Sequence, residues 1–189
     1  MASITIGFLV PWFLGGLAVL WFWWRRRLNQ LHRRNVRRSR ALLKRLRSGL
    51  FQPGQMIVYL RKIDPLLFEE LVLTAFENSG APVIRNRRYS GDHGVDGRFW
   101  WRHKLVLTQC KRYQGEIHPE HVSAFARAVR REQASAGLFV HTGRTGFASY
   151  CALRAAGRSV VLVSGGRLVS LLLGRLDLDE LLGTRSRAA

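Results

Sequence analysis

The feature that most constrains this chain is an uncharged, apolar stretch at residues 4–24. Its length is about that needed to cross the hydrocarbon core of a membrane as a helix. Three arginines follow it directly, whereas no charged side chain precedes it. The positive-inside rule then places the N-terminus outside and the remaining chain in the cytoplasm. We therefore predict a transmembrane helix at residues 1–25, in a single-pass protein of a bacterial-type inner (cytoplasmic) membrane.

Basic residues are concentrated next to this apolar stretch. The chain has 31 Lys and Arg against 12 Asp and Glu, a net charge of +19, and no acidic residue precedes Asp64. Such a charge indicates a polyanionic partner. For the basic segment at 26–57, two interpretations stay open: an amphipathic helix held at anionic lipid headgroups, or one that also binds a nucleic-acid backbone. Pro53 and Gly54 predict a linker at its end. The two cysteines form no CxxC pair, which favours a reducing compartment.

Residues 58–183 have the pattern of one α/β domain, followed by a flexible tail at 184–189. Asp64 and Pro65 predict the start of a helix that ends near Gly80. An antiparallel hairpin followed by strand-helix-strand units predicts a mixed central β-sheet flanked by helices on both faces. The further elements expected are strands at 82–88, 136–142 and 159–165, a hairpin at 95–113, and helices at 119–133 and 146–157.

One group of residues in the hairpin has the side chains of a candidate metal-dependent site. Side chains alternate along a strand, so Gln109 and Lys111 share a face, and Asp96 lies on the partner strand within reach of the same end of the sheet. Asp96, the Gln109 carbonyl and the Cys110 backbone carbonyl, together with a phosphate oxygen, are the oxygen ligands that Mg²⁺ prefers. His118 and His121 are expected to mark the start of a surface helix rather than a metal site.

The segments FEELV, SGDHGVDG, LTQCKRY and GLFVHTGRTGF resemble the Mrr-like branch of the PD-(D/E)xK nuclease superfamily, from about residue 64 to 165. The resemblance implies a restriction-endonuclease-like fold and DNA cleavage with Mg²⁺ or Mn²⁺. It gives catalytic roles to Asp96, Gln109 and Lys111, assisted by Glu69. Glu70 is the neighbouring alternative to Glu69. His141 stands where relatives more often have a threonine-rich turn, so it receives no role.

These observations lead to three functional hypotheses. The first is a restriction- or repair-like DNA endonuclease tethered to the cytoplasmic face of the membrane. Cutting both strands usually needs two active sites, which predicts a homodimer. The second is a tethered nucleic-acid-binding module with a weak or inactive site, because Gln109 stands where many relatives have a carboxylate. The third interprets the basic charge as affinity for lipid alone.

Overall fold

The computed structural model of the chain describes residues 30–86 and 94–184. Contacts divide the chain after Asn35, and residues 30–35 are helical. The second unit begins at Val36 and contains all five strands of the sheet. Within the described ranges, no helix has the length and apolarity that crossing a bilayer requires. The predicted transmembrane helix at 1–25 lies outside these ranges, so it stays a prediction.

Five strands form one mixed sheet, and their order across the sheet is their order along the chain. The first three strands pair antiparallel, and the third, fourth and fifth pair parallel. The predicted α/β class, with a hairpin leading into parallel strands, is therefore confirmed. The strands are β1 (Val83–Arg85), β2 (Gly97–Trp101), β3 (Lys104–Lys111), β4 (Ala136–His141) and β5 (Val160–Val163).

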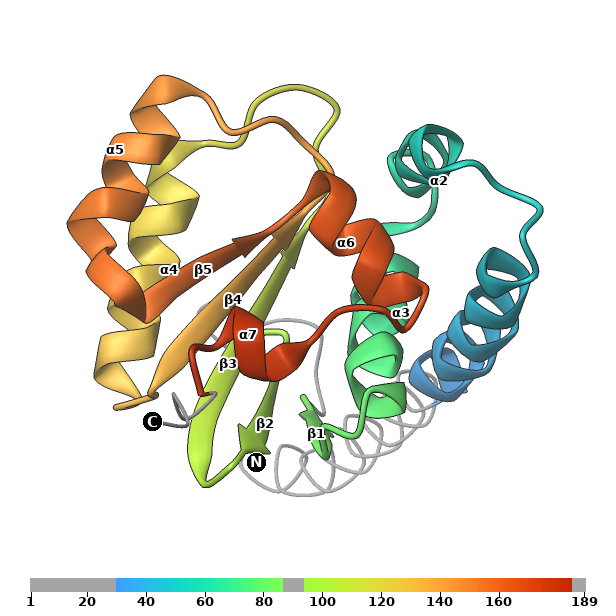
Figure 1. The fold of residues 1–189 in the computed structure, drawn as a ribbon, viewed down its shortest axis with the longest axis horizontal. Helices are drawn as coiled ribbons and strands as arrows, with labels where there is room; N and C mark the ends of the chain where they lie inside the picture. Colours follow the sequence, from blue (N-terminus) through green and yellow to red (C-terminus); the bar gives the residue numbers. More distant parts are fainter. Residues whose placement is uncertain (1–29, 87–93, 185–189) are drawn as a thin grey trace, which may run out of the picture. The chain divides into compact units, whose positions relative to one another are not determined.

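Helices cover both faces of the sheet (Figure 1). On one face lie α2 (Pro53–Leu60), α3 (Pro65–Asn78) and α6 (Gly165–Leu172). On the other lie α4 (Pro119–Arg131) and α5 (Phe147–Ala156). The short helices η1 (Gly157–Ser159) and α7 (Leu178–Leu181) complete the described fold. The prediction of helices on both faces is confirmed, although α2, α6 and α7 were not predicted.

Helix α3 begins as its sequence predicts. The Asp64 side chain accepts a hydrogen bond from the Leu67 backbone N–H at 3.1 Å, and Pro65 occupies the first helical position, where no N–H is needed. The position of this helix matters for the site because it carries Glu69 to the end of the sheet.

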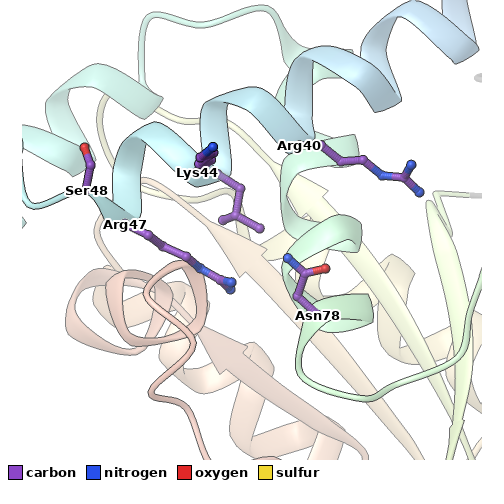
Figure 2. Close-up of a pocket in the computed structure, with 6 residues that line it drawn as sticks. Arg40, Lys44, Arg47, Ser48 and Asn78 are labelled. Carbon is purple, nitrogen blue, oxygen red and sulfur yellow. The ribbon is translucent and has the colours of Figure 1, made fainter.

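The helix at residues 36–47 is amphipathic, as predicted, but its apolar face is covered by protein. Leu42, Leu43 and Leu46 are buried in the cluster that includes α3, while basic side chains stand on the open side (Figure 2). Pro53 is the first residue of α2, so the expected linker at Pro53 and Gly54 was wrong. The core thus begins before residue 58, which was the predicted start of the folded domain.

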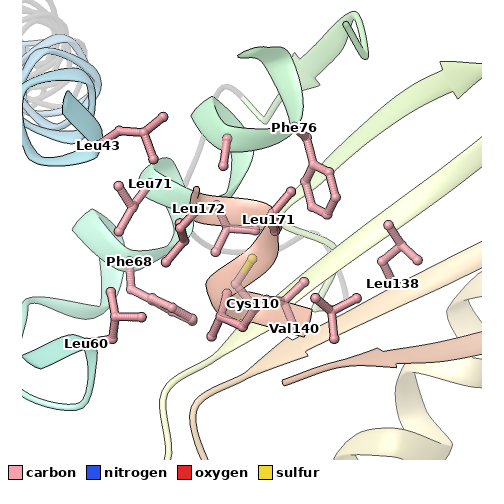
Figure 3. Close-up of a cluster of buried hydrophobic side chains, with 14 of the residues drawn as sticks. Leu43, Leu60, Phe68, Leu71, Phe76, Cys110, Leu138, Val140, Leu171 and Leu172 are labelled. Carbon is pink, nitrogen blue, oxygen red and sulfur yellow. The ribbon is translucent and has the colours of Figure 1, made fainter. Parts of the chain in front are cut away.

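Strand alternation separates two clusters of buried side chains. Cys110, Leu138 and Val140 point to the α3 side (Figure 3), whereas Leu107 and Phe139 point to the α4 side. Successive residues of a strand face opposite ways. Gln109 and Lys111 therefore share the α4 side with Leu107, as the hairpin pattern predicts.

Candidate active site

Asp96 is fixed to the β3 backbone at two points. Its N–H donates to the Thr108 carbonyl at 2.8 Å, and its carboxylate Oδ2 accepts from the Cys110 N–H at 2.6 Å. The first bond continues the β2–β3 ladder by one residue beyond Gly97, and the second aims the carboxylate at the C-terminal half of β3. The proximity of Asp96 to the QxK segment, expected from the hairpin, is therefore present in the structure.

Gln109 lies beside a glycine that leaves room for it. The Gln109 side chain is 5% exposed, and within the described ranges its buried Oε1 has no hydrogen-bond partner. A Cβ on Gly94 would lie 2.3 Å from Gln109 Nε2, and Gly94 has φ +82°. Glycine is thus required there both by the backbone conformation and by the packing of the amide. Sequence reasoning did not single out Gly94 as a site residue.

The charges of Asp96 and Lys111 both affect the pKa of the Glu69 carboxyl group. Burial, reinforced by the negative charge of Asp96, raises the pKa of Glu69 to about 8, while the Lys111 charge acts in the opposite direction. Glu70 instead accepts a hydrogen bond from Arg85 Nε at 3.0 Å. Glu70 is thus tied to Arg85, whereas Glu69 is the carboxyl group whose pKa responds to both Asp96 and Lys111. The choice of Glu69 over Glu70 stays a prediction.

The donor atoms fit a hard divalent cation. Within the described ranges, no cluster of three His, Cys, Asp or Glu side chains has the arrangement of a metal site. Oxygen is nevertheless available from the Asp96 carboxylate, the Glu69 carboxyl and the unpartnered Gln109 Oε1. Mg²⁺ usually takes one or two carboxylates and keeps several waters or phosphate oxygens. The unsatisfied buried carbonyl of Gln109 is the observation that favours such an ion here.

Cys110 contributes its backbone rather than its thiol. The thiol is buried on the α3 face of the sheet, away from Gln109, and burial raises its pKa well above the ordinary value. A thiol of this kind is neither a nucleophile nor a metal ligand at neutral pH. The Cys110 backbone carbonyl as a metal ligand stays a prediction.

Two histidines and a tyrosine gather next to Lys111. The rings of His118 and His121 are 5.5 Å apart and meet edge-on, and a hydrogen bond joins Tyr113 Oη to His121 Nδ1. Burial, then the charge on Lys111, lowers the pKa of His121. His118 directly precedes α4, as predicted. The nearness of His121 to Lys111 was missed, because it depends on how α4 packs on the sheet.

His141 lies at the end of β4, paired with Lys111 in the strand register. Its side chain is fully buried. Burial lowers the pKa of His141 to about 4, although the backbone of Gly143 acts in the opposite direction. The ring is therefore neutral at pH 7, and we assign it no role in the site.

Comparison with known proteins identifies the nuclease region. Residues 60–172 match the restriction endonuclease family Mrr_cat. A solved structure of the MspJI restriction endonuclease in complex with a 27-mer oligonucleotide shares 27% sequence identity with this chain, with a TM-score of 0.41. The match covers 77% of this chain but about a third, 35%, of that one. No curated protein matches the chain.

Proposed function

Because the chain belongs to the Mrr_cat restriction endonuclease family, we propose that it is a metal-dependent DNA endonuclease that hydrolyses phosphodiester bonds at Asp96, Gln109, Lys111 and Glu69. Family membership supports DNA endonuclease activity and DNA as the partner. The observation that supports the assignment of the site is the electrostatic coupling of Glu69 to Asp96 and Lys111, together with the buried, unpartnered Gln109 carbonyl on the same strand as Lys111.

Each residue has a distinct task in this mechanism. Asp96 and Gln109, with Glu69, would hold a Mg²⁺ or Mn²⁺ ion, which acts as a Lewis acid toward the phosphoryl oxygens when bound. Lys111 places an ammonium group where negative charge develops on the phosphate, and it donates hydrogen bonds to that phosphate or to the attacking water. The Cys110 N–H keeps the Asp96 carboxylate from rotating, so the geometry exists before substrate arrives.

The amide of Gln109 sets the electrostatics of the site. It contributes a dipole where a carboxylate would contribute a full negative charge, so the cation is held by less charge. Glu69 offsets this, since a cation beside a carboxyl group with a raised pKa favours its ionised form. We propose that the site therefore loads metal with the loss of a proton from Glu69, and that its metal affinity increases with pH.

Tethering and assembly belong to the proposal as well. We place the nuclease at the cytoplasmic face of the membrane, anchored through residues 1–25, on the strength of the uncharged stretch and the arginines that follow it. We also propose a homodimer for double-strand cleavage. The activity is restriction-like or repair-like, directed at DNA that approaches the inner membrane.

The test is cleavage of supercoiled plasmid by the full chain with Mg²⁺, with Mn²⁺ and with chelator. Lys111→Ala and Asp96→Asn are each expected to lower the rate by at least about 100-fold, as removal of one preorganised electrostatic group does. Lys104→Ala removes the same charge from the exposed start of β3, and it is expected to retain the rate.

Several results would count against the proposal. Cleavage that persists with chelator, or in Lys111→Ala, would exclude this site. A wild-type chain that folds and binds DNA but never cuts it would favour the binding module, with the weakly charged Gln109 site as the cause. Absence of DNA binding altogether would leave lipid as the partner of the basic charge.

A further inference from the structure

A basic pocket lies beside α3, on the helix of residues 36–47. Arg40, Lys44 and Arg47 follow one another at spacings of four and three, so they share one side of the helix. Figure 2 shows Arg47 reaching toward Asn78 at the end of α3, while Arg40 lies farther along the same helix. The cavity has a volume of about 430 Å³ and is also lined by Leu43 and Ser48.

The positive charge of this pocket is available to a ligand. Glu77 is 3.9 Å from Arg40, but the Arg40 side chain is 64% exposed, and such surface pairs are weak. Arg85 occupies both Glu77 oxygens with hydrogen bonds of 3.0 Å, and it is the main cause of the lowered pKa of Glu77. Arg40 therefore has no strong competing carboxylate among the described residues, and those lining the pocket are cationic or neutral.

Arg47 is held in position before any ligand arrives. Its Nε donates to the Leu172 carbonyl at 2.8 Å, which leaves the two terminal nitrogens of the guanidinium for a ligand. A Cβ on Gly174 would come within 3.3 Å of Arg47 Nη2, and Gly174 has φ +71°. The turn after α6 thus accommodates the guanidinium, and less side-chain entropy is lost when it binds an anion.

The cations of the pocket are spaced to contact the backbone of a nucleic acid. Arg40 and Arg47 lie about 10.5 Å apart along the helix axis, a length over which one DNA strand presents more than one phosphate. Asn78 follows Glu69 by nine residues on the same helix, or about 14 Å, so the pocket and the proposed catalytic residue lie within reach of one duplex. We propose that this pocket binds backbone phosphates of the DNA that is being cut, an inference that rests on the proposed function.

The packing of this helix favours DNA over a membrane surface. A helix that binds lipid as an amphipathic element inserts its apolar face between the headgroups. Here Leu42, Leu43 and Leu46 are committed to the protein core, so only the basic side is available. Except for Asn78, the residues that line the pocket lie outside the family match at residues 60–172.

The experiment measures binding separately from cleavage. The full chain is titrated into a fluorescently labelled 30-bp duplex in chelator over a range of salt concentrations. Arg40→Gln with Lys44→Gln and Arg47→Gln is expected to flatten the slope of log affinity against log salt by about 2.7, from about 0.9 per lost phosphate contact. The value of kcat at saturating DNA is expected to stay within twofold, while KM rises at least tenfold.

Two further variants serve as controls. Arg127→Gln with Arg130→Gln and Arg154→Gln removes equal charge from exposed positions of α4 and α5 on the other face, and it is expected to keep the slope. The double variant Arg40→Gln with Lys44→Gln leaves the Arg47 hydrogen bond intact in case the triple variant unfolds, and it is expected to lose about 1.8 of slope.

Several outcomes would overturn the proposal. These are an unchanged slope in the folded double variant, or an equal loss in the control triple. A third is selective loss of binding to phosphatidylserine vesicles with DNA binding intact, which would assign the pocket to lipid headgroups. If the wild-type chain binds DNA through the pocket but does not cleave with Mg²⁺, the proposed function fails and the pocket stands.

Discussion

At the scale of single residues, the position of the Gln109 side chain depends on Gly94 having no side chain. Gly94→Ala places a methyl group in the space of the Gln109 amide and strains a backbone at φ +82°. A displacement of about 1 Å in a catalytic group costs up to about 100-fold in rate. We expect kcat for plasmid cleavage to fall 10- to 100-fold, within the limit that this displacement sets.

The matched control for this change is Gly115→Ala, since an added Cβ there meets nothing within 4 Å. It is expected to keep kcat and the midpoint of thermal unfolding. If Gly94→Ala cleaved DNA at the wild-type rate, Gln109 would not need its present position, and its assignment to the site would have to be withdrawn.

The raised pKa of Glu69 predicts a pH dependence of stability without metal. The folded chain keeps the Glu69 proton up to a pH of about 8, whereas the ordinary value is 4.5. Between these values the folded state binds more protons than the unfolded state, so the free energy of unfolding falls as pH rises. Glu69→Gln has no such proton and is expected to lack this part of the slope.

Urea unfolding in chelator from pH 5 to pH 8 measures this difference. The wild-type chain is expected to lose stability relative to Glu69→Gln as pH rises, by at most about 1.4 kcal/mol per pH unit. The control variant is Glu120→Gln, which makes the same chemical change at an exposed position of α4. A constant difference between wild type and Glu69→Gln across this range would mean that Glu69 titrates normally in the folded chain.

Residue pairing also marks where sequence reasoning ends. The alternation of β3 and the hairpin spacing are sufficient to group Asp96, Gln109 and Lys111. The preference for Glu69 over Glu70 in the proposed site rests on Arg85, which bonds to Glu70 from β1, and β1 follows α3 in the chain. No local pattern on the helix contains that information. The His121 contact is likewise set by tertiary packing.

At the scale of elements, the helix of residues 36–47 belongs to the fold. Leu46 is fully buried among residues of the core. Leu46→Ala is therefore expected to lower the free energy of unfolding by about 2–5 kcal/mol, as cavity-forming Leu→Ala changes do. Leu50 is 70% exposed, so Leu50→Ala is expected to stay within about 0.5 kcal/mol of wild type. Equal unfolding midpoints in urea for the two variants would show that this helix is not part of the cooperative unit.

The contribution of the helix of residues 36–47 to the core was not predicted, because arginines are so frequent in and around it. Its apolar positions follow the helical spacing of three and four, as those of α3 do, but so many cations suggested a lipid surface or a linker. By contrast, the strands and the helices α3, α4 and α5 were predicted close to their observed bounds, because cap residues and alternation are local signals. Helix α6 was not predicted, because its leucines come only a few residues after β5 and follow a pair of glycines.

At the scale of the whole molecule, dimerisation predicts how products depend on protein concentration. A single active site cuts one strand at a time, whereas two sites held together cut both. With supercoiled plasmid and Mg²⁺, we expect nicked circles to dominate at low protein concentration and linear DNA to increase as the concentration rises. A ratio of linear to nicked product that stays constant over a 100-fold range of protein would contradict the homodimer.

The strands stand in the sheet in the order in which a ribosome makes them. Each new strand can add to an exposed edge, and none has to be inserted between two strands already paired. The hairpin with Asp96, Gln109 and Lys111 therefore emerges from the ribosome before β4 and β5 emerge. Its two strands can pair with each other while the later strands are still inside the ribosome. The parallel strands then add to an edge that is already formed, and α4 covers the second face of the sheet.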